Sequence, residues 1–252
     1  MPAPSASLLA SIFSAGPLRQ HARLLHLEVA GEPVQAPDPS GRPGPVQWAI
    51  ESLHAEETLF RDFCTTLTLL ADSACVALKD MLGRVLTASL VRPDGSRRHF
   101  CGHVFEFALL GSDAGIARYR AVLRPWLHHL QLRVNNRVFL GQGLHQQSAA
   151  VLADHTPLPH GSGDWQWNVR GEDPPFTMAC QGGGIGESDW NYLHRRWEAA
   201  GYSYHWEHAP GAHTLVVGDD STTQSQPLDG DTPDLRFQSQ GGAQAADAIA
   251  HR

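Results

Sequence analysis

The side chains best suited to chemistry gather in one stretch, residues 187–208, which reads ESDWNYLHRRWEAAGYSYHWEH. Its carboxylates and histidines are the groups that serve most often as general acids and bases in hydrolases. One interpretation therefore gives acid–base roles to a set of four residues. They are Asp189, His194, His205 and Glu207. On this interpretation, which is one alternative, the chain is a hydrolase.

The first half of this stretch also has the pattern of a helix that packs one face on a core. Ser188 is a favoured N-cap residue, and Asp189 in the first turn suits the helix dipole. Gly201 fits the left-handed position just past the end of a helix over 188–200. Apolar residues recur at helical spacing along it. This stripe consists of Trp190, Leu193, Trp197 and Ala200.

The second half of the stretch alternates like a strand. Tyr202, Tyr204 and Trp206 would share one face, with His205 on the other. His205 and His208 would then lie on opposite faces, where they cannot readily bind one metal ion. Because aromatic side chains are usually buried, we expect the helix and the strand to fold against each other. This favours a structural interpretation over a catalytic one.

Other signatures of catalysis or of cofactor binding are missing from the sequence. It contains no G-x-S-x-G, H-E-x-x-H or G-x-x-x-x-G-K-[ST] motif. The histidine pairs His128-His129 and His155/His160 lack the spacing of a zinc site. We therefore expect no catalytic residue, no metal ligand and no cofactor.

Composition and charge narrow the class of protein. The chain has 252 residues, of which 24 are Gly and 17 are Pro, and this favours a turn-rich β protein over a helical bundle. The formal net charge of -7 argues against nucleic-acid partners. No apolar run approaches the roughly twenty residues of a membrane span, and the N-terminus lacks the positive charges of a signal peptide. The 4 cysteines show no C-x-x-C pairing, so we expect a cytosolic protein with reduced thiols.

The rest of the sequence predicts short strands separated by turns. Asp94-Gly95 favours a tight hairpin turn. The strand predicted at 116–124 would bury Tyr119 and turn its arginines outward, and Pro125 would end it. Further helices are expected at 5–13, 76–83 and 143–155, Pro/Gly-rich loops at 31–47 and 156–175, a hairpin at 202–218, and a polar, acidic tail after it.

Three sequence elements are specific in combination. They are an F-x-G-x-V element (Phe100, Gly102 and Val104), an LRPWL turn (with Arg124, Pro125 and Trp126), and the ESDWNYL helix (with Ser188, Trp190 and Leu193, followed by Trp197). With their surroundings they resemble the N-terminal part of the VgrG family, the spike proteins of bacterial type VI secretion systems. The similar segments are 16–29, 60–72, 82–107, 117–139 and 187–220.

The resemblance implies an α+β fold of antiparallel, β-barrel-based domains with short covering helices, similar to the hub of contractile phage tails. It implies a structural, non-enzymatic role in a homotrimer on which the hexameric inner-tube ring protein docks. Spike-tip or effector proteins would join through the C-terminal part. The protein would be made in the cytoplasm and delivered out of the cell with the apparatus. An adaptor-like binding module derived from a truncated spike is a further alternative.

The ten residues of these three elements are expected to have structural roles. Gly102 would allow a close approach of the backbone or a bulge, Pro125 and Trp126 would fix a corner, and the tryptophans of the ESDWNYL helix would hold it on a sheet.

We expect three regions along the chain. Residues 1–47 would hold a helix, a strand and a Pro-rich loop leading into the first barrel, and 48–143 the first β-rich hub domain. Residues 144–252 would hold a helix-containing segment and the start of a second hub domain, expected to be truncated because the sequence stops where members of that family are still within the hub region. The glycines at 181–186 would be an insertion before the helix.

Overall fold

The computed structural model describes residues 23–37, 41–92, 94–113, 115–155, 165–182 and 185–220. Its elements confirm an α+β protein made mostly of antiparallel strands with a few short helices. The helix predicted at 5–13 and the polar tail lie outside the described residues.

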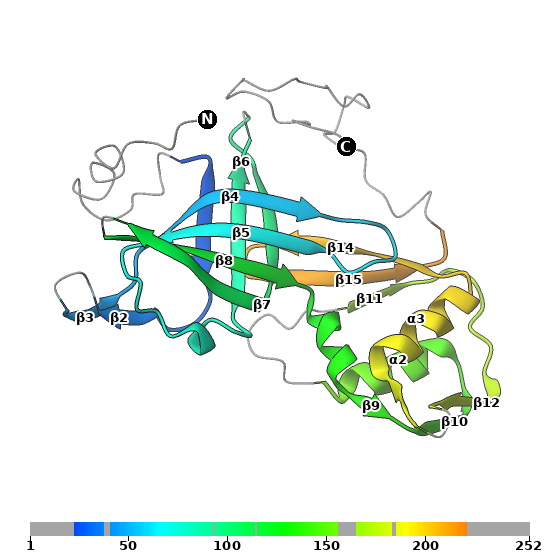
Figure 1. Cartoon of the computed structure of the whole chain (residues 1–252). Helices are drawn as coiled ribbons and strands as arrows, with labels where there is room; N and C mark the ends of the chain where they lie inside the picture. The colour runs from blue at the N-terminus through cyan, green and yellow to red at the C-terminus, as the bar shows by residue number, and fades with distance from the viewer. Residues whose placement is uncertain are drawn as a thin grey trace.

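The largest element is a six-stranded antiparallel sheet that curls into a half-barrel (Figure 1). Its strand order is β1-β6-β7-β8-β5-β4. The strands are β1 (Leu25–Val29), β4 (Trp48–Glu56), β5 (Cys64–Ala71), β6 (Val85–Val91), β7 (Arg97–Asp113) and β8 (Ile116–Arg124).

Irregularities in the strand pairing explain the curl. The register of β4 shifts between Ile50 and Ser52, and the long strand β7 shifts against β8 between Val104 and Glu106. Such bulges bend a strand and increase its twist. The outer strands β1 and β4 thereby come into contact.

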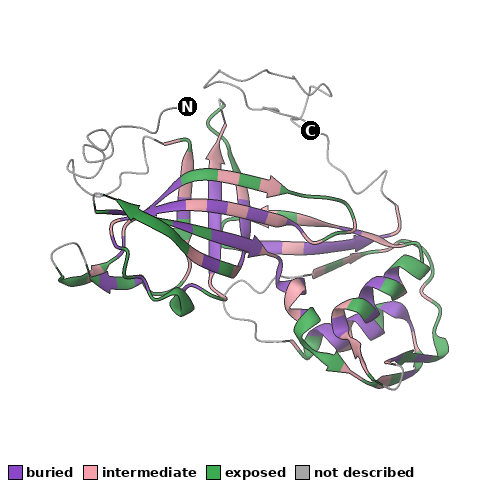
Figure 2. Ribbon diagram, viewed as in Figure 1, coloured by how far each residue is buried: buried purple, intermediate pink, exposed green. Residues whose placement is uncertain are grey.

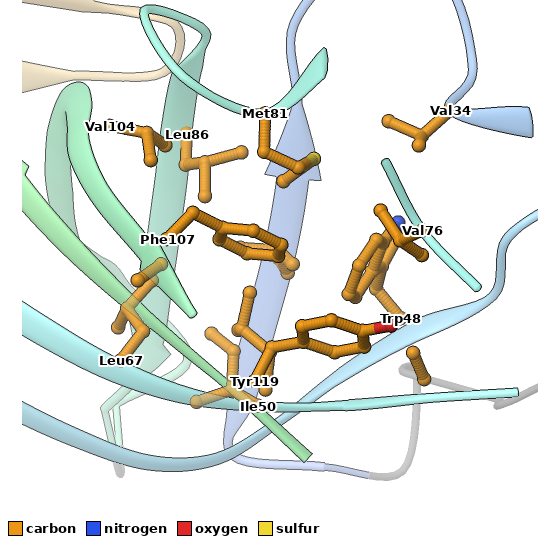
Figure 3. Close-up of a cluster of buried hydrophobic side chains, with 14 of the residues drawn as sticks. Val34, Trp48, Ile50, Leu67, Val76, Met81, Leu86, Val104, Phe107 and Tyr119 are labelled. Atoms are coloured by element: carbon orange, nitrogen blue, oxygen red, sulfur yellow. The ribbon is translucent and has the colours of Figure 1, made fainter. Parts of the chain in front are cut away.

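The inner face of the half-barrel holds a hydrophobic core (Figure 3). The alternation predicted for the strand at 116–124 is confirmed in β8, where Tyr119 is fully buried and Arg118 and Arg120 are exposed. The predicted turn at Asp94-Gly95 is also confirmed, because Gly95 has a left-handed φ of 83° in the connection between β6 and β7. Local sequence therefore specifies most of this sheet.

The prediction that 31–47 contains no regular structure is wrong. Strands β2 (Gln35–Pro37) and β3 (Pro43–Pro45) form a short antiparallel ladder, followed by a hydrogen bond of 2.9 Å from the Val46 N–H to the Val34 carbonyl. Bonded pairs alternate with non-bonded pairs in such a ladder, so the proline pairs fall where no N–H is needed. Proline content alone did not exclude strands here.

Two other expectations need correction. The predicted connection 156–175 contains strand β11 (Trp165–Asn168), which pairs in parallel with β15 (Ala212–Gly218). The predicted helix at 76–83 is reduced to one 3₁₀ turn, η2 (Leu78–Asp80). Both segments are too short for their sequences to show the periodicity of a strand or of a helix.

A second hydrophobic core follows the half-barrel. Its helices are η3 (Trp126–Leu132), α2 (Leu144–Ala153) and α3 (Asp189–Ala199), which confirms the helices predicted at 143–155 and 188–200. Its strands are β9 (Val134–Asn135), β10 (Arg137–Gln142), β12 (Phe176–Gln181), β13 (Glu187–Ser188), β14 (Ser203–Ala209) and β15.

The change from the first core to the second falls between Leu123 and Trp126. Strand β1 already pairs with β6, so it belongs to the same sheet as the strands after residue 47. The division at 47/48 and 143/144 stays a prediction. Buried residues run along the barrel strands and along one side of α2 and α3 (Figure 2).

Candidate functional site at the junction of the two cores

The start of helix α3 agrees with the sequence prediction, but the residues that the helix buries differ from the predicted stripe. The Ser188 hydroxyl accepts a hydrogen bond from the Asn191 N–H at 3.1 Å. Leu193 and Trp197 are fully buried, and the Trp197 indole donates to the Ser148 hydroxyl at 2.9 Å. Ala200, which the stripe included, is exposed. Of the predicted stripe, Leu193 and Trp197 are therefore fully buried.

Tyr192 is a core residue that the stripe missed. It is fully buried, stacks on Phe139 with ring centroids 5.5 Å apart, and donates its hydroxyl to Gln147 at 2.7 Å. The helix therefore buries a broader face than the predicted stripe. A hydrophobic pattern that discounts Tyr as polar does not reveal this.

Trp190 is half-buried. Its ring stacks on His194 at 3.7 Å between centroids, and its indole donates to Asp62 at 3.2 Å. Trp190 thus faces the loop between β4 and β5 and is less buried than Trp197.

The four residues of the hydrolase alternative form three separate groups. Buried Asp189 accepts hydrogen bonds from His155 at 2.7 Å and from Gln181 at 2.6 Å. His194 lies 2.8 Å from the Tyr204 hydroxyl. His205 and Glu207 lie 3.8 Å apart on β14, with Glu207 exposed.

The titration of these groups fits a structural role. Burial lowers the pKa of His194, and its Nδ1 donates to the Trp190 carbonyl at 2.8 Å. Burial raises the pKa of Tyr204. Burial alone would raise the pKa of Asp189, but the hydrogen bonds from His155 and Gln181 bring it below its ordinary value. A charged Asp189 beside a donor is suited to hold β12 and α3 together.

The loop between β4 and β5 fastens the half-barrel to the second core. Asp62 accepts hydrogen bonds from the Trp190 indole and from His128, the latter at 3.0 Å. Phe60 has a left-handed φ of 59°, uncommon for a residue with a side chain. Its N–H donates to the Tyr204 carbonyl at 2.9 Å. These contacts span residues far apart in sequence, so no local pattern predicts them.

A cluster of histidines, two of them fully buried and two half-buried, forms the other part of the junction. His103 on β7 and His213 on β15 are fully buried, with ring centroids 5.7 Å apart. His129 of η3 packs edge-on against His103 at 5.2 Å. His208 of β14 lies 4.7 Å from the Phe63 ring. No local sequence pattern predicts this cluster, because its members lie on four different elements.

The residues of the F-x-G-x-V element and of the LRPWL turn line this junction. Phe100, Gly102 and Val104 are buried on β7. A Cβ placed on Gly102 would lie 3.0 Å from the Phe63 ring and 3.1 Å from the Arg124 carbonyl. Phe63 and β8 thus approach β7 closely at this glycine.

Pro125 and Trp126 lie at the start of η3. Pro125, with a φ of -66°, is its N-cap residue, and Arg124 before it is half-buried at the end of β8. Trp126 is buried, and its N–H donates to His213 Nε2 at 3.0 Å. The chain turns here from the first core into the second.

The β10–β12 ladder lies beside α2 and α3 (Figure 1). Its outer face exposes apolar side chains. Val138, Leu140 and Met178 share this face through the pairs Val138↔Cys180 and Leu140↔Met178. Their exposures are 60%, 66% and 62%. The opposite face contributes Phe139 and Ala179 to the second core. A short ladder that is apolar on both faces is typical of a sheet covered from both sides.

No set of three potential metal ligands comes together among the described residues. No helix in this part of the chain is long and apolar enough to cross a bilayer. The described residues form two hydrophobic cores that are in contact at this junction, and the β10–β12 ladder of the second core exposes apolar side chains.

Comparison with known proteins connects this geometry to a family. Residues 56–252 match the family of the phage tail baseplate hub (GPD). The type VI secretion system spike protein VgrG1c of Pseudomonas aeruginosa is 27% identical over 207 residues, which are 79% of this chain and 25% of that protein. VgrG1b of the same organism is 26% identical over 176 residues, covering 68% of this chain and 22% of the relative. The chain thus spans about a quarter of these relatives' length.

Solved structures show the same fold. An E. coli protein, c3393, described as a component of the type VI secretion system with similarity to T4 bacteriophage tail proteins gp27 and gp5, superposes with a TM-score of 0.64 at 18% identity. The alignment covers 80% of this chain and 51% of that one. The half-lidded PdpA-VgrG complex of Francisella gives a TM-score of 0.51 at 10% identity over 85% of this chain and 34% of that one.

These neighbours confirm the expected hub-like architecture, a curled β-barrel sheet with short helices. The family model covers far more than half of the chain, and it is a family of structural tail components rather than of enzymes. The chain belongs to the phage tail baseplate hub family.

Proposed function

We propose that the chain is a hub portion of a type VI secretion spike and acts by assembly. It forms a homotrimer, receives the hexameric inner-tube ring protein, and leaves the cell with the apparatus. The observation that carries this proposal is the family match over residues 56–252, together with relatives that are spike proteins.

The exposed face of the β10–β12 ladder supports assembly. A second copy of this chain is the occupant we propose for it, because a homotrimer is built from contacts between copies. Each subunit of a three-fold ring presents two different patches, so this face would meet a different surface of its neighbour. In a separate subunit Val138, Leu140 and Met178 are exposed to water. A neighbouring subunit that covers them would remove this apolar surface from water, which favours association.

Both alternatives account for less of the structure. A hydrolase needs a base, its partner and a nucleophile in reach of one another, whereas Asp189, His194 and His205 lie in separate groups. An adaptor-like module would expose a binding face but would remain a monomer until its partner arrives. The oligomeric state separates the adaptor from the hub.

The test is the mass of the full chain over a concentration series, measured by sedimentation velocity and native mass spectrometry. We expect monomers and trimers in a reversible equilibrium that shifts to trimer as concentration rises. A chain that stays monomeric up to its solubility limit contradicts the trimer.

Two charged variants locate the contact. Leu140→Glu with Met178→Glu places carboxylates on the ladder and is expected to abolish the trimer while the fold persists by circular dichroism. Leu110→Glu, on an exposed position of β7, is the matched control and should still assemble. If the double variant assembles like the parent and the control does not, the contact lies on β7 instead.

A further inference from the structure

Four histidine rings occupy the contact between the half-barrel and the second core. His103 comes from β7, His129 from η3, and His208 and His213 from the β14–β15 hairpin. Neighbouring centroids are 5.2 Å apart for His103 and His129, 5.7 Å for His103 and His213, and 6.4 Å for His208 and His213. The cluster is therefore continuous from one core to the other.

Two of these rings are hydrogen-bond acceptors. His213 Nε2 accepts the Trp126 N–H at 3.0 Å, and His208 Nδ1 accepts the Cys101 N–H at 3.1 Å. A neutral imidazole has one acceptor nitrogen, but an imidazolium has two donors and no acceptor. A second proton on either ring must therefore break a bond that joins the hairpin to η3 or to β7.

The groups around the cluster do little to stabilise a positive charge on any of its rings. His103 Nδ1 faces the Gly83 carbonyl at 3.2 Å, and His129 Nδ1 faces the Trp126 carbonyl at 3.2 Å. The groups that act electrostatically on His213 are the three other histidines. Protonation of one ring thus opposes protonation of the next.

Charged groups occur at the rim of the cluster. Glu57 lies 3.5 Å from His208 Nε2, where it favours protonation, but Arg98 pairs with the same carboxylate at 3.0 Å. Arg98 and His99 both oppose a charge on His208. On the η3 side, His128 pairs with Asp62 at 3.0 Å and acts on His129 as a like charge.

From this arrangement we propose that the cluster is an acid-sensitive latch. While its rings are neutral the β14–β15 hairpin is held on β7 and η3, and protonation in acidic surroundings releases the hairpin before the half-barrel unfolds. This proposal stands independently of the proposed function, because it concerns the contact between the cores and requires no partner.

The direction of the effect follows from the titration of the rings. Burial lowers the pKa of His103 to about 4 and also lowers the pKa of His129 and His208, while that of His213 falls well below its usual range. Released histidines titrate near their ordinary value, so the open state binds more protons. The closed latch is therefore fully stable when the pH is above the ordinary pKa of histidine. This stability is lost as the pH falls toward the lowered pKa values of the buried rings. Between these pKa values, each ring that stays neutral in the closed state and is protonated in the open state lowers the ratio of closed to open molecules about tenfold for every unit by which the pH falls.

Hydrogen exchange of the full chain, followed by mass spectrometry at about pH 7.5 and about pH 5, tests the latch across the range in which histidine titrates. After correction for the intrinsic exchange rate, peptides covering 203–218 are expected to lose protection at the lower pH. Peptides from β5 and β8 should keep theirs. Equal protection of 203–218 at both values overturns the proposal.

Matched variants show whether these rings are responsible. His213→Gln and His208→Asn together place an amide oxygen where each ring now accepts, and neither side chain titrates. The double variant should open less than the parent at the lower pH, because only His103 and His129 still titrate in the cluster. His54→Gln, at a side chain that is 73% exposed, should open like the parent. Opening of the double variant to the parent's extent overturns the proposal.

A measurement on the parent protein alone remains decisive if the double variant fails to fold. The imidazole resonances of His208 and His213 can be followed by NMR as the pH is lowered. If both rings take up a proton near the ordinary histidine value while the hairpin stays protected, the latch does not exist. If protonation and loss of protection occur together, it does.

Discussion

The two cores of this molecule are built from different chemistry. The half-barrel is filled mainly by aliphatic and aromatic side chains (Figure 3), and Tyr119 donates its hydroxyl to the Ser73 carbonyl inside it at 3.0 Å. The second core joins its aromatic residues to polar partners through side-chain hydrogen bonds. These pairs are Tyr192 with Gln147, Trp197 with Ser148, and Tyr204 with His194.

The two regions therefore obtain the specificity of their packing in different ways. An apolar core tolerates exchanges that conserve volume, so many sequences can fill the half-barrel. A buried hydrogen-bonded pair fixes one arrangement, because removal of one partner leaves the other without a bond. We therefore expect the second core to be the more sensitive to small polar changes.

The largest effect is expected for Trp197→Ala. The mutation removes a fully buried indole and leaves the Ser148 hydroxyl without its donor, so it should lower the free energy of unfolding by about 3–5 kcal/mol. Trp190→Ala, at a half-buried ring, should cost clearly less. Urea denaturation of both variants measures the two losses. Equal losses would show that Trp190 matters as much to the core as Trp197.

A smaller effect is expected where β7 meets β8 and Phe63. In Gly102→Ala the new methyl group would sit 3.1 Å from the Leu123 Cβ as well as close to the Phe63 ring, and overpacking of this kind costs about 1–3 kcal/mol. Gly111→Ala on the same strand meets no atom within 4 Å and should be neutral or slightly stabilising. Thermal melts compare the pair. A Gly102→Ala variant as stable as Gly111→Ala would mean that the strands separate easily here.

Removing one hydroxyl from each core tests the comparison directly. Tyr204→Phe deprives His194 of a partner at 2.8 Å and takes a hydroxyl from beside Asp62 at 3.4 Å, for a loss of about 1–3 kcal/mol. Tyr119→Phe removes a single bond and should cost about 1 kcal/mol. Chemical denaturation gives both values. If Tyr119→Phe is the costlier change, the half-barrel depends on polar contacts more than its composition indicates.

Predictability from the sequence follows the same division. The alternation of β8, the turn at Asp94-Gly95 and the capped helix α3 are local patterns, and all of them are confirmed. Strands β2 and β11 were missed because their pairing, rather than their own periodicity, makes them strands. Short segments carry too little pattern to distinguish a strand from a loop.

The junction could not be predicted for a related reason. Asp62 meets Trp190 across 128 positions of sequence, and the Cys101 N–H meets His208 across 107. A lone histidine or aspartate in a sequence says nothing about such a partner. The resemblance predicted structural roles for Gly102, Pro125 and Trp126 but gave no account of the rings around them.

The smallest effects are expected at the helix caps, which are single hydrogen bonds near the surface. Helix α3 is capped by its own Ser188, whereas the first N–H groups of α2 are capped by Asp173, which lies beyond the end of that helix in sequence. The Asp173 carboxylate accepts from the Leu144 N–H at 2.6 Å and from the His145 N–H at 2.8 Å. One cap is therefore local and the other depends on the tertiary fold.

Ser188→Ala and Asp173→Ala should each cost about 1 kcal/mol, the usual loss when a helix cap is removed. They should nevertheless differ in how far a milder change restores stability. Asp173→Asn keeps one side-chain oxygen as an acceptor, so it can remake only one of the two bonds to α2 and should recover part of the loss. Urea denaturation of the three variants compares these losses. If Asp173→Asn is as costly as Asp173→Ala, the cap requires both oxygens of Asp173 together, and the start of α2 then depends on this distant side chain more strictly than the start of α3 depends on Ser188.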